Sequence, residues 1–391
     1  MQSQHSAAAA NSALRKQLDK RLSDNSLRSL RISSSDGIDL CSNDYLGFAR
    51  SGELAALIES QSVSDEHRLN GSTGSRLLTG NSVLAEDLEK FISNYHKAES
   101  GLIFNSGYDA NVGLFSCIAR RNDTILYDEL SHASIIDGIR LSYSNSFKFR
   151  HNDTEHLEEL LRKAVGTVYV AVESVYSMDG DLAPLKEIVE LCKKYNAALI
   201  VDEAHATGVF GKEGEGRVVE LGIEKDVFAR MYTFGKAIGC HGAIVLGSDV
   251  LKQYLVNFSR PFIYSTALPP QSLLAVKCAY EFLKKNSCRI DELKNNIHFF
   301  NEQVKKIKKV KLIDSSSAIQ CVVINGNEQV KRAAETIQAS GYNVKAILSP
   351  TVAGGSERLR ICLHSFNSKE EITGLLRIIE SLIPSPAKIN R

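Results

Sequence analysis

The stretch Ala197-Ala198-Leu199-Ile200-Val201-Asp202-Glu203-Ala204-His205 decides the fold class that this chain is expected to adopt. Its continuous apolar run, bounded by polar residues, is typical of a strand covered on both faces, as in a parallel sheet. Ligands of such sheets bind beyond the carboxyl ends of the strands, so the carboxylate of Asp202 is predicted at the mouth of a site. A helix N-cap is the alternative for Asp202, because aspartate is also favoured where a strand turns into a helix.

A second stretch, Thr233-Phe234-Gly235-Lys236-Ala237-Ile238-Gly239, surrounds one lysine with glycines and almost no other charge. Glycine lets a large group approach the backbone closely, and we interpret Lys236 as a lysine within a cleft. On this stretch alone, a surface turn is the stronger interpretation. Asp202 upstream changes that balance, because an acid and a lysine at the ends of two strands are what pyridoxal 5′-phosphate (PLP) chemistry requires. The lysine holds the aldehyde of the cofactor, and the acid keeps its pyridine nitrogen protonated.

Length and composition are those of an ordinary globular protein. A chain of 391 residues allows two or more domains. The 47 Lys and Arg residues nearly balance the 46 Asp and Glu residues, so no net field indicates nucleic acid or a membrane surface as a partner. No run of 18 apolar residues predicts a membrane span.

The eight cysteines indicate neither a metal site nor a disulfide framework. They are scattered without a C-x-x-C pair, and several stand in apolar contexts, where free cysteine is commonly buried. We therefore expect no bound metal and a reducing, cytoplasmic environment. The glycine-rich segment 71–80 has neither a Walker motif nor the spacing of a dinucleotide fingerprint, which argues against a nicotinamide dehydrogenase.

The order of predicted elements indicates an arm, a large domain and a small domain. The N-terminus is expected to form a disordered tip and then a helix over about 14–30, because leucines recur there at helical spacing. A core-facing helix at 82–96 precedes predicted strands at 101–104, 124–127, 168–172 and 242–247. From about 285 the pattern changes to a helix, strand 318–324, helix 329–339, strands 343–348 and 358–363, and helix 369–382. We divide the chain into an arm (1–47), a large cofactor-binding domain (48–284) and a small C-terminal α+β domain (285–391).

The turn Asn105-Ser106-Gly107-Tyr108 follows the first of these strands and leads into a helix. The start of a helix offers free backbone N–H groups and a partial positive charge, which suit a phosphate. We assign Gly107 and Tyr108 to the phosphate of the cofactor.

Seven motifs stand in order along the chain: Ser42-Asn43-Asp44-Tyr45-Leu46-Gly47, Ser106-Gly107-Tyr108-Asp109-Ala110-Asn111, Ser131-His132-Ala133-Ser134, Ser177-Met178-Asp179-Gly180-Asp181, Val201-Asp202-Glu203-Ala204-His205, Thr233-Phe234-Gly235-Lys236 and Tyr264-Ser265-Thr266-Ala267-Leu268-Pro269-Pro270. Together they resemble the α-oxoamine synthases, PLP enzymes that condense an amino acid with an acyl thioester and release carbon dioxide. The resemblance covers nearly the whole chain after the arm. It implies an α/β fold of the PLP-dependent aminotransferase type (fold type I), with a mostly parallel sheet in the large domain. It also implies a homodimer with shared active sites.

Within this family, the motifs at 43–47 and 264–270 look most like the member that joins L-alanine to a pimeloyl thioester in biotin biosynthesis. Sister activities are the alternatives: glycine C-acetyltransferase, serine palmitoyltransferase and 5-aminolevulinate synthase. The run Ile135-Ile136-Asp137-Gly138-Ile139-Arg140 also occurs in the acetyltransferase. A cofactor-binding regulator would need a DNA-binding module, and no separate basic helical domain flanks the core.

The resemblance also implies roles for single residues. Lys236, Asp202 and His132 form the catalytic set, with His132 stacked on the pyridine ring and assisting proton transfer. A lone histidine after a strand is otherwise more often a structural hydrogen-bond partner. The remaining cofactor contacts are Ser177, His205 as donor to the ring phenolate oxygen, Thr233 at the phosphate, and Thr266, which reaches the phosphate of the neighbouring subunit.

For the substrates, the resemblance implies that Arg28 reaches the acyl substrate and that Asn43 and Arg360 meet the amino-acid carboxylate, with Thr351 as a further contact. An Asx-type turn is an equal alternative for Asn43. In a strand Arg358 would point to the same face as Arg360, so spacing alone does not choose between them.

The chain departs from the family pattern in two places. Leu348 stands where many members that use pimeloyl thioesters carry an arginine, and Cys240-His241-Gly242 replaces the more usual Val-Ser-Gly. Neither change removes the cofactor site. Both weaken the transfer of an acyl-substrate preference, and the length and carrier of the acyl chain stay open.

Overall fold

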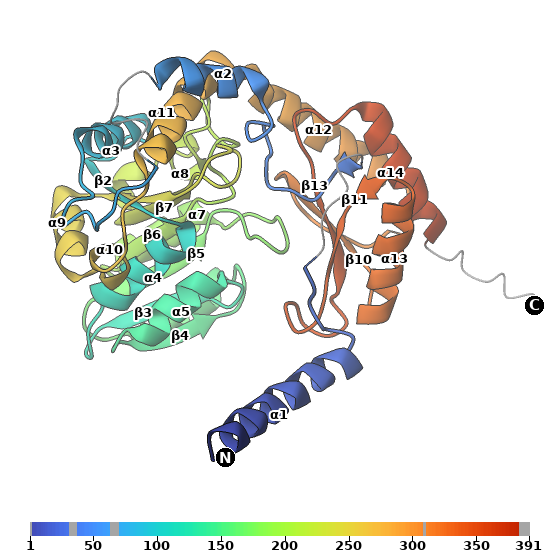
Figure 1. Ribbon diagram of the computed structural model, residues 1–391, viewed down its shortest axis with the longest axis horizontal. Helices are drawn as coiled ribbons and strands as arrows, with labels where there is room; N and C mark the ends of the chain where they lie inside the picture. The colour runs from blue at the N-terminus through green and yellow to red at the C-terminus, as the bar shows by residue number, and fades with distance from the viewer. Residues whose placement is uncertain (1, 31–36, 63–69, 308–309, 383–391) are drawn as a thin grey trace, which may run out of the picture.

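A seven-stranded sheet forms the centre of the large N-terminal part of the chain in the computed structural model, which describes residues 2–30, 37–62, 70–307 and 310–382 (Figure 1). Its order is β2-β8-β7-β6-β5-β3-β4. Neighbouring strands are parallel except β8, which is antiparallel to both β2 and β7. The strands are β2 (Ser100–Phe104), β3 (Thr124–Asp128), β4 (Asn145–Phe149), β5 (Val168–Glu173), β6 (Ala198–Asp202), β7 (Ala229–Thr233) and β8 (Ala243–Gly247). This confirms the predicted α/β class with a mostly parallel sheet.

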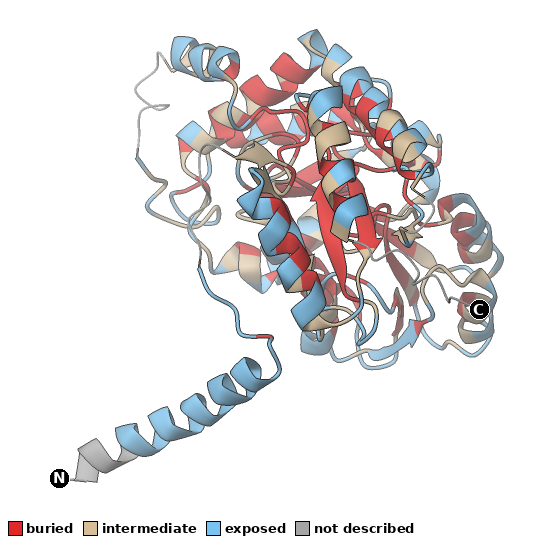
Figure 2. Cartoon of the chain, turned by 90° about the vertical axis from the view of Figure 1, so that its right-hand side faces the viewer, coloured by how far each residue is buried: buried red, intermediate tan, exposed pale blue. Residues whose placement is uncertain are grey.

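The central strand β6 is covered on both faces, as its apolar run predicts. Successive side chains of a strand point to opposite faces. Ile200 packs in one apolar cluster, whereas Leu199 and Val201 pack in another. The first cluster includes residues of α4 (Gly107–Ile118), α5 (Ala133–Leu141), α9 (Asp249–Phe258) and α10 (Arg260–Ile263), and the second those of α6 (Thr154–Leu161), α7 (Leu185–Lys194) and α8 (Arg217–Glu220). Figure 2 shows the strands as the buried centre of the molecule.

A third apolar cluster joins the large part of the chain to its C-terminal part. It contains residues of α2 (Gly52–Gln61), α3 (Val83–Tyr95), α11 (Pro270–Lys285), α12 (Cys288–Val304), α13 (Asn327–Ala339) and α14 (Lys369–Leu382). The predicted helix at 82–96 is confirmed as α3, whose N-cap Ser82 accepts a hydrogen bond from the Ala85 amide. The proposed domain boundary at 284/285 falls at the end of α11.

The C-terminal part contains a four-stranded antiparallel sheet in the order β12-β13-β10-β9. Its strands are β9 (Leu312–Ile313), β10 (Ile319–Val323), β12 (Lys345–Ile347) and β13 (Arg358–Cys362). A separate parallel pair is formed by β1 (Ile38–Asp39), from the segment assigned to the arm, and β11 (Tyr342–Asn343). The predicted helices and the strands at 318–324 and 358–363 are present, but the single strand predicted at 343–348 is divided into β11 and β12, which belong to different sheets. The short β9 was not indicated by the sequence pattern.

The N-terminal helix α1 spans Gln2–Ser23, so the predicted bounds of 14–30 and the disordered tip were wrong. The alanines at 7–10 are strong helix formers and extend the helix toward the N-terminus. At the other end, Asn25 adopts a left-handed φ of 51° and the Ser26 amide bonds to the Arg21 carbonyl. This is a Schellman stop, and it ends the helix before Leu27. From Ala7 onward the residues of α1 are exposed, and the helix projects from the body (Figures 1 and 2).

Candidate active site

The carboxyl ends of the central strands bring the predicted catalytic residues together. Asp202 is the last residue of β6, and Glu173, the last residue of β5, lies beside it in register. Lys236 follows the end of β7. The side chain of Lys236 is close enough to Asp202 and Glu173 to feel both charges. The prediction that an acid and a lysine meet at this edge of the sheet therefore agrees with the geometry.

Lys236 is a partly buried amine with a lowered pKa. Burial lowers its pKa to about 8, although the negative charges of Asp202 and Glu173 act in the opposite direction. A substantial fraction of the amine is then neutral near pH 8, as a nucleophile or general base requires. The pKa of Glu173 is raised well above its ordinary value, because the carboxyl is buried and lies beside the charge of Asp202.

Asp202 is buried and held by two hydrogen bonds. Its Oδ1 accepts from the Ala204 amide at 2.8 Å, and its Oδ2 accepts from Asn111 Nδ2, also at 2.8 Å. The Asn111 amide group thereby fixes the plane of the carboxylate from the first turns of α4. The Asn111 Oδ1 atom is buried and has no hydrogen-bond partner among the described residues.

His132 is exposed and lies at the start of α5, within reach of the charges of Asp202 and Lys236. Its backbone amide donates to Glu173 Oε1. Its ring Nδ1 lies 2.7 Å from Ser134 Oγ and accepts from the Ser134 amide at 3.2 Å. Because Nδ1 accepts from this amide, it carries no proton, and the Ser134 hydroxyl donates to it while accepting from Asn111 Nδ2 at 3.0 Å. The proton of a neutral imidazole then resides on Nε2.

The residues predicted to hold a phosphate converge at the start of α4. Gly107 is the first residue of α4, after the N-cap Ser106. A methyl group added to Gly107 would lie 3.6 Å from Thr233 Oγ1, and one added to Gly235 would lie 3.8 Å from it. Thr233, at the end of β7, thus stands beside the free N–H groups of a twelve-residue helix.

Tyr108 and Thr266 lie at the surface near this point. The Tyr108 ring is exposed, and its hydroxyl donates to Asp137 Oδ2. Thr266 is also exposed, and its carbonyl accepts from Asn105 Nδ2 at 2.8 Å. Asn105 directly precedes the N-cap of α4, so the segment of Thr266 lies at the rim of the phosphate region.

Arg360 and Arg358 have different partners, which separates the two alternatives left open by the sequence. The buried Arg360 donates from Nη2 to Asn43 Oδ1 at 3.1 Å and from Nε to the Ser177 carbonyl at 2.8 Å. Its third contact is Cys362 Sγ, at 3.0 Å from Nη1. Arg358 is instead paired with Asp179. Only Arg360 therefore shares a site with Asn43 and lies near enough to Lys236 to act on its pKa.

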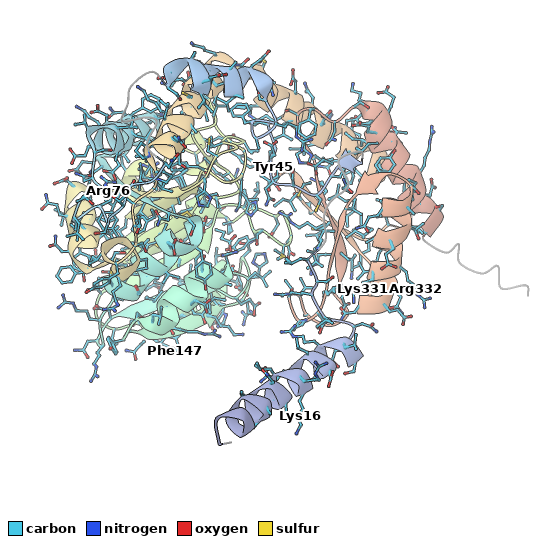
Figure 3. The ribbon with its side chains drawn as sticks, in the orientation of Figure 1. Lys16, Tyr45, Arg76, Phe147, Lys331 and Arg332 are labelled. Atoms are coloured by element: carbon cyan, nitrogen blue, oxygen red, sulfur yellow. The ribbon has the colours of Figure 1, made fainter. Side chains whose placement is uncertain are left out.

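Tyr45 connects this arginine to the second predicted imidazole. Its buried hydroxyl donates to Asn43 Oδ1 at 3.1 Å and lies 2.7 Å from His205 Nδ1. Burial and the positive charge of Lys236 hold the pKa of His205 well below its ordinary value. In Figure 3, Tyr45 lies between the seven-stranded sheet and the C-terminal strands. A continuous polar chain thus runs from Arg360 through Asn43 and Tyr45 to His205.

Arg28, predicted to reach the acyl substrate, lies beside Thr351, the further substrate contact predicted from the sequence. Arg28 Nη2 lies 3.3 Å from Thr351 Oγ1, and both side chains are exposed. Leu348, where other members carry arginine, packs against the apolar core. Cys240 and His241 line a surface cavity of about 340 Å³ together with residues of α2 and α11.

Several residues of this site were not assigned a role from the sequence, namely Glu173, Asn111, Ser134, Tyr45 and Cys362. Glu173 carries the same signal as Asp202, a carboxylate at the end of an apolar strand, and could have been found that way. Asn111 lies one helical turn after Gly107, on the same face of the helix. Ser134 is recognisable only from its contacts with His132 and Asn111, and Tyr45 and Cys362 only once β13 and the segment 42–47 are known to be adjacent.

These residues fit PLP. The site offers an amine for the aldehyde, an acid for the pyridine nitrogen, two imidazoles and a helix N-terminus for the phosphate. Fold and site together define a PLP-dependent enzyme of the aminotransferase type, fold type I. In the part of the chain that the structure describes, no helix has the length and apolar character needed to cross a bilayer.

Comparison with known proteins agrees with this class. The profile of the family "Aminotransferase class I and II" matches residues 35–379. The chain is 41% identical to an 8-amino-7-oxononanoate synthase of Emericella nidulans, over 94% of each sequence. Among solved structures it resembles a serine palmitoyltransferase from S. paucimobilis with PLP and myriocin bound, at 26% identity and a TM-score of 0.86, covering 95% and 96% of the two chains. It also resembles an 8-amino-7-oxononanoate synthase from Francisella tularensis, at 28% identity and a TM-score of 0.78, covering 89% of this chain and 98% of the other.

The chain therefore belongs to the α-oxoamine synthases, PLP-dependent acyltransferases of the class I and II aminotransferase family. This confirms the resemblance carried by the seven motifs. The motifs at 43–47 and 264–270 indicated one member of this family, 8-amino-7-oxononanoate synthase, and the relatives from Emericella nidulans and Francisella tularensis both carry that name.

Proposed function

We propose that this protein condenses L-alanine with a pimeloyl thioester to give 8-amino-7-oxononanoate, carbon dioxide and free thiol, in biotin biosynthesis. One observation carries the proposal: the polar chain from Arg360 to His205 places a guanidinium that can bind a carboxylate beside Lys236. An amino acid bound there has its carboxylate and its α-carbon at the two ends of one site. The names of the relatives support alanine and pimeloyl as the substrates.

Each residue of the site has a separate role in the proposed reaction. Arg360 and Asn43 hold the carboxylate of the amino acid, since a guanidinium fork matches two carboxylate oxygens. Lys236 removes the proton from the α-carbon, for which an amine with a pKa of about 8 is well suited. Bound PLP supplies an electron-accepting ring. Asp202 would pair with its ring nitrogen, His132 would stack on the ring, and the start of α4 with Thr233 would hold its phosphate.

Two further parts of the proposal concern assembly. We place the protein in the cytoplasm as a homodimer in which Thr266 reaches the phosphate of the partner's cofactor. Thr266 and Tyr264 are both exposed in the single chain, as are Leu77 and Leu78. Large apolar side chains that are exposed near a site indicate a surface that another subunit covers.

The experiment that tests the function is release of free thiol from pimeloyl, acetyl and palmitoyl thioesters, each offered with alanine, glycine and serine. Highest kcat/KM with alanine and the pimeloyl thioester is expected. Serine palmitoyltransferase is the second candidate, because a structure of that name has a TM-score of 0.86 with this chain. Preference for serine with palmitoyl thioester would replace the first proposal by the second.

Arg360→Gln should raise KM for L-alanine by about 10- to 100-fold, because a charged hydrogen bond contributes about 1.5–3 kcal/mol. KM for the thioester should change little. Arg360→Lys keeps the charge but loses the planar fork of donors. Its KM for L-alanine should therefore fall between the values of wild type and Arg360→Gln. Lys345→Gln is the control, since this exposed cation lies directly across from Arg360 in the sheet and makes no contact with Asn43. Equal KM values for alanine in Arg360→Gln and wild type would refute the assignment.

Arg28→Ala should raise KM for the acyl thioester about fivefold and leave KM for alanine unchanged, because its guanidinium lies exposed beside Thr351. The matched control is Arg21→Ala, which removes an exposed arginine of the same arm from α1. An identical effect of the two substitutions would show that the arm contributes only its general positive charge.

A further inference from the structure

The loop at 177–182, between β5 and α7, is bonded to the two arginines of β13. The Ser177 carbonyl accepts from Arg360 Nε at 2.8 Å, and Asp179 pairs with Arg358. The Gly180 carbonyl accepts from Ser315 Oγ at 2.7 Å. Since Ser177 fixes one edge of the Arg360 guanidinium, the position of this loop determines where that guanidinium points.

His151, which follows β4, holds the other side of this loop. Its Nε2 lies 2.6 Å from Asp181 Oδ2, and its Nδ1 lies 2.9 Å from Asp128 Oδ1. Both ring nitrogens face carboxylate oxygens, so both donate and the ring carries a positive charge. Burial would lower the pKa of His151, but the hydrogen bonds to the two carboxylates outweigh it and raise the pKa to about 10.

The neighbours of His151 strengthen the same connection. Asn152 donates from Nδ2 to Asp181 Oδ2 at 2.7 Å and from its backbone to Asp128 Oδ2 at 2.9 Å. The edge of the Tyr176 ring packs against the imidazole, with ring centroids 4.5 Å apart. Asp128 is fully buried and ends β3, four residues before His132. One imidazolium therefore joins the loop that carries His132 to the loop that carries Ser177.

We propose that His151 is a positioning residue: its contacts with Asp128 and Asp181 hold the loop at 177–182 so that Arg360 is placed to receive the carboxylate of the amino acid. The proposal rests on the proposed function of this site. His151, Asp179 and Asp181 also have the spacing of a metal-ligand group. Asp181 is already paired with His151, and Asp179 with Arg358, so the geometry favours the positioning role.

His151→Gln tests the proposal, because glutamine keeps a donor for one carboxylate but cannot join both. We expect KM for L-alanine, and its dissociation constant measured from the absorbance of bound PLP without thioester, to rise about tenfold. KM for the thioester and the dissociation constant for PLP should stay within about twofold of wild type. The control is His156→Gln, in the same segment, where the ring only accepts a bond from the Arg150 amide.

A double-mutant cycle with Asp181→Asn separates this role from general destabilisation. If His151 acts through Asp181, the double variant should bind alanine no more weakly than the worse single variant, because the contact is lost only once. Additive losses, or a His151→Gln variant with wild-type alanine binding, would overturn the proposal. A variant that loses PLP and alanine affinity equally would overturn it as well.

The same measurements distinguish a wrong substrate assignment from a wrong positioning role for His151. If wild type binds glycine or serine instead of alanine, the proposed substrate is wrong. The double-mutant cycle is then measured with the amino acid that does change the PLP absorbance. A selective loss of affinity for that amino acid still supports the positioning role, since Arg360 binds the carboxylate that all three share.

Discussion

Lys236→Ala is expected to lower kcat by about a thousandfold or more, because we propose that the amine both holds the cofactor and moves the proton of the α-carbon. Its partly buried position, beside Asp202 and Glu173 and with a pKa of about 8, makes it the reactive amine of the site. The second readout is covalent attachment. After borohydride reduction, the wild-type peptide that contains Lys236 should carry the mass of PLP, and the variant should carry none.

Lys225→Ala is the control for this experiment, because Lys225 is exposed and lies outside the site. It should retain both turnover and the labelled peptide at 236. If Lys236→Ala kept substantial turnover, or if the label appeared on another lysine of the wild-type protein, the assignment of the cofactor lysine would be wrong.

Asp202→Asn is expected to lower kcat by about a hundredfold to a thousandfold, the usual effect of removing one preorganised charge from an active site. Asparagine also has one acceptor oxygen where the carboxylate accepts from both the Ala204 amide and Asn111 Nδ2, so one of these two donors would face an amide donor. Weaker PLP binding and an altered absorbance of the bound cofactor should accompany the loss of turnover.

Glu173→Gln provides a matched comparison on the neighbouring strand. Burial and the charge of Asp202 raise the pKa of Glu173 well above its ordinary value, and glutamine keeps the shape of this carboxyl without its ionisation. We expect kcat within about threefold of wild type, since the acceptor for the His132 amide is kept. If Glu173→Gln were as damaging as Asp202→Asn, the charge that the cofactor needs would be shared by both acids.

The fold could be predicted largely from local patterns. The apolar run before Asp202 indicated a strand covered on both faces, and the spacing of apolar residues indicated α3 and the elements of the C-terminal part. The strand β4 was not predicted because four of its five residues are exposed and Phe147 and Phe149 are its only apolar residues, which is too short a pattern to indicate a strand. The bounds of α1 were missed because the end of this helix depends on the backbone conformation of Asn25, not on its leucines.

The site residues that follow strand ends could be predicted from the sequence. Those whose role depends on contacts between distant segments could not. Asp202 and Lys236 follow strands, so the sheet places them. The choice between Arg358 and Arg360 depends on Asp179 and Asn43, which lie 179 and 317 residues away in sequence. No pattern of spacing within β13 contains that information.

The pairing of β1 with β11 has a consequence for how the two substrates are gathered. Ile38 and Asp39 pair with Tyr342 and Asn343, and the Leu40 carbonyl accepts from the Cys362 amide. The segment 38–40 is thus fastened to the C-terminal part, which also carries Thr351 and Arg360, two of the residues proposed to contact the substrates. Any rotation of this part against the seven-stranded sheet would therefore move the segment 38–40, Thr351 and Arg360 together.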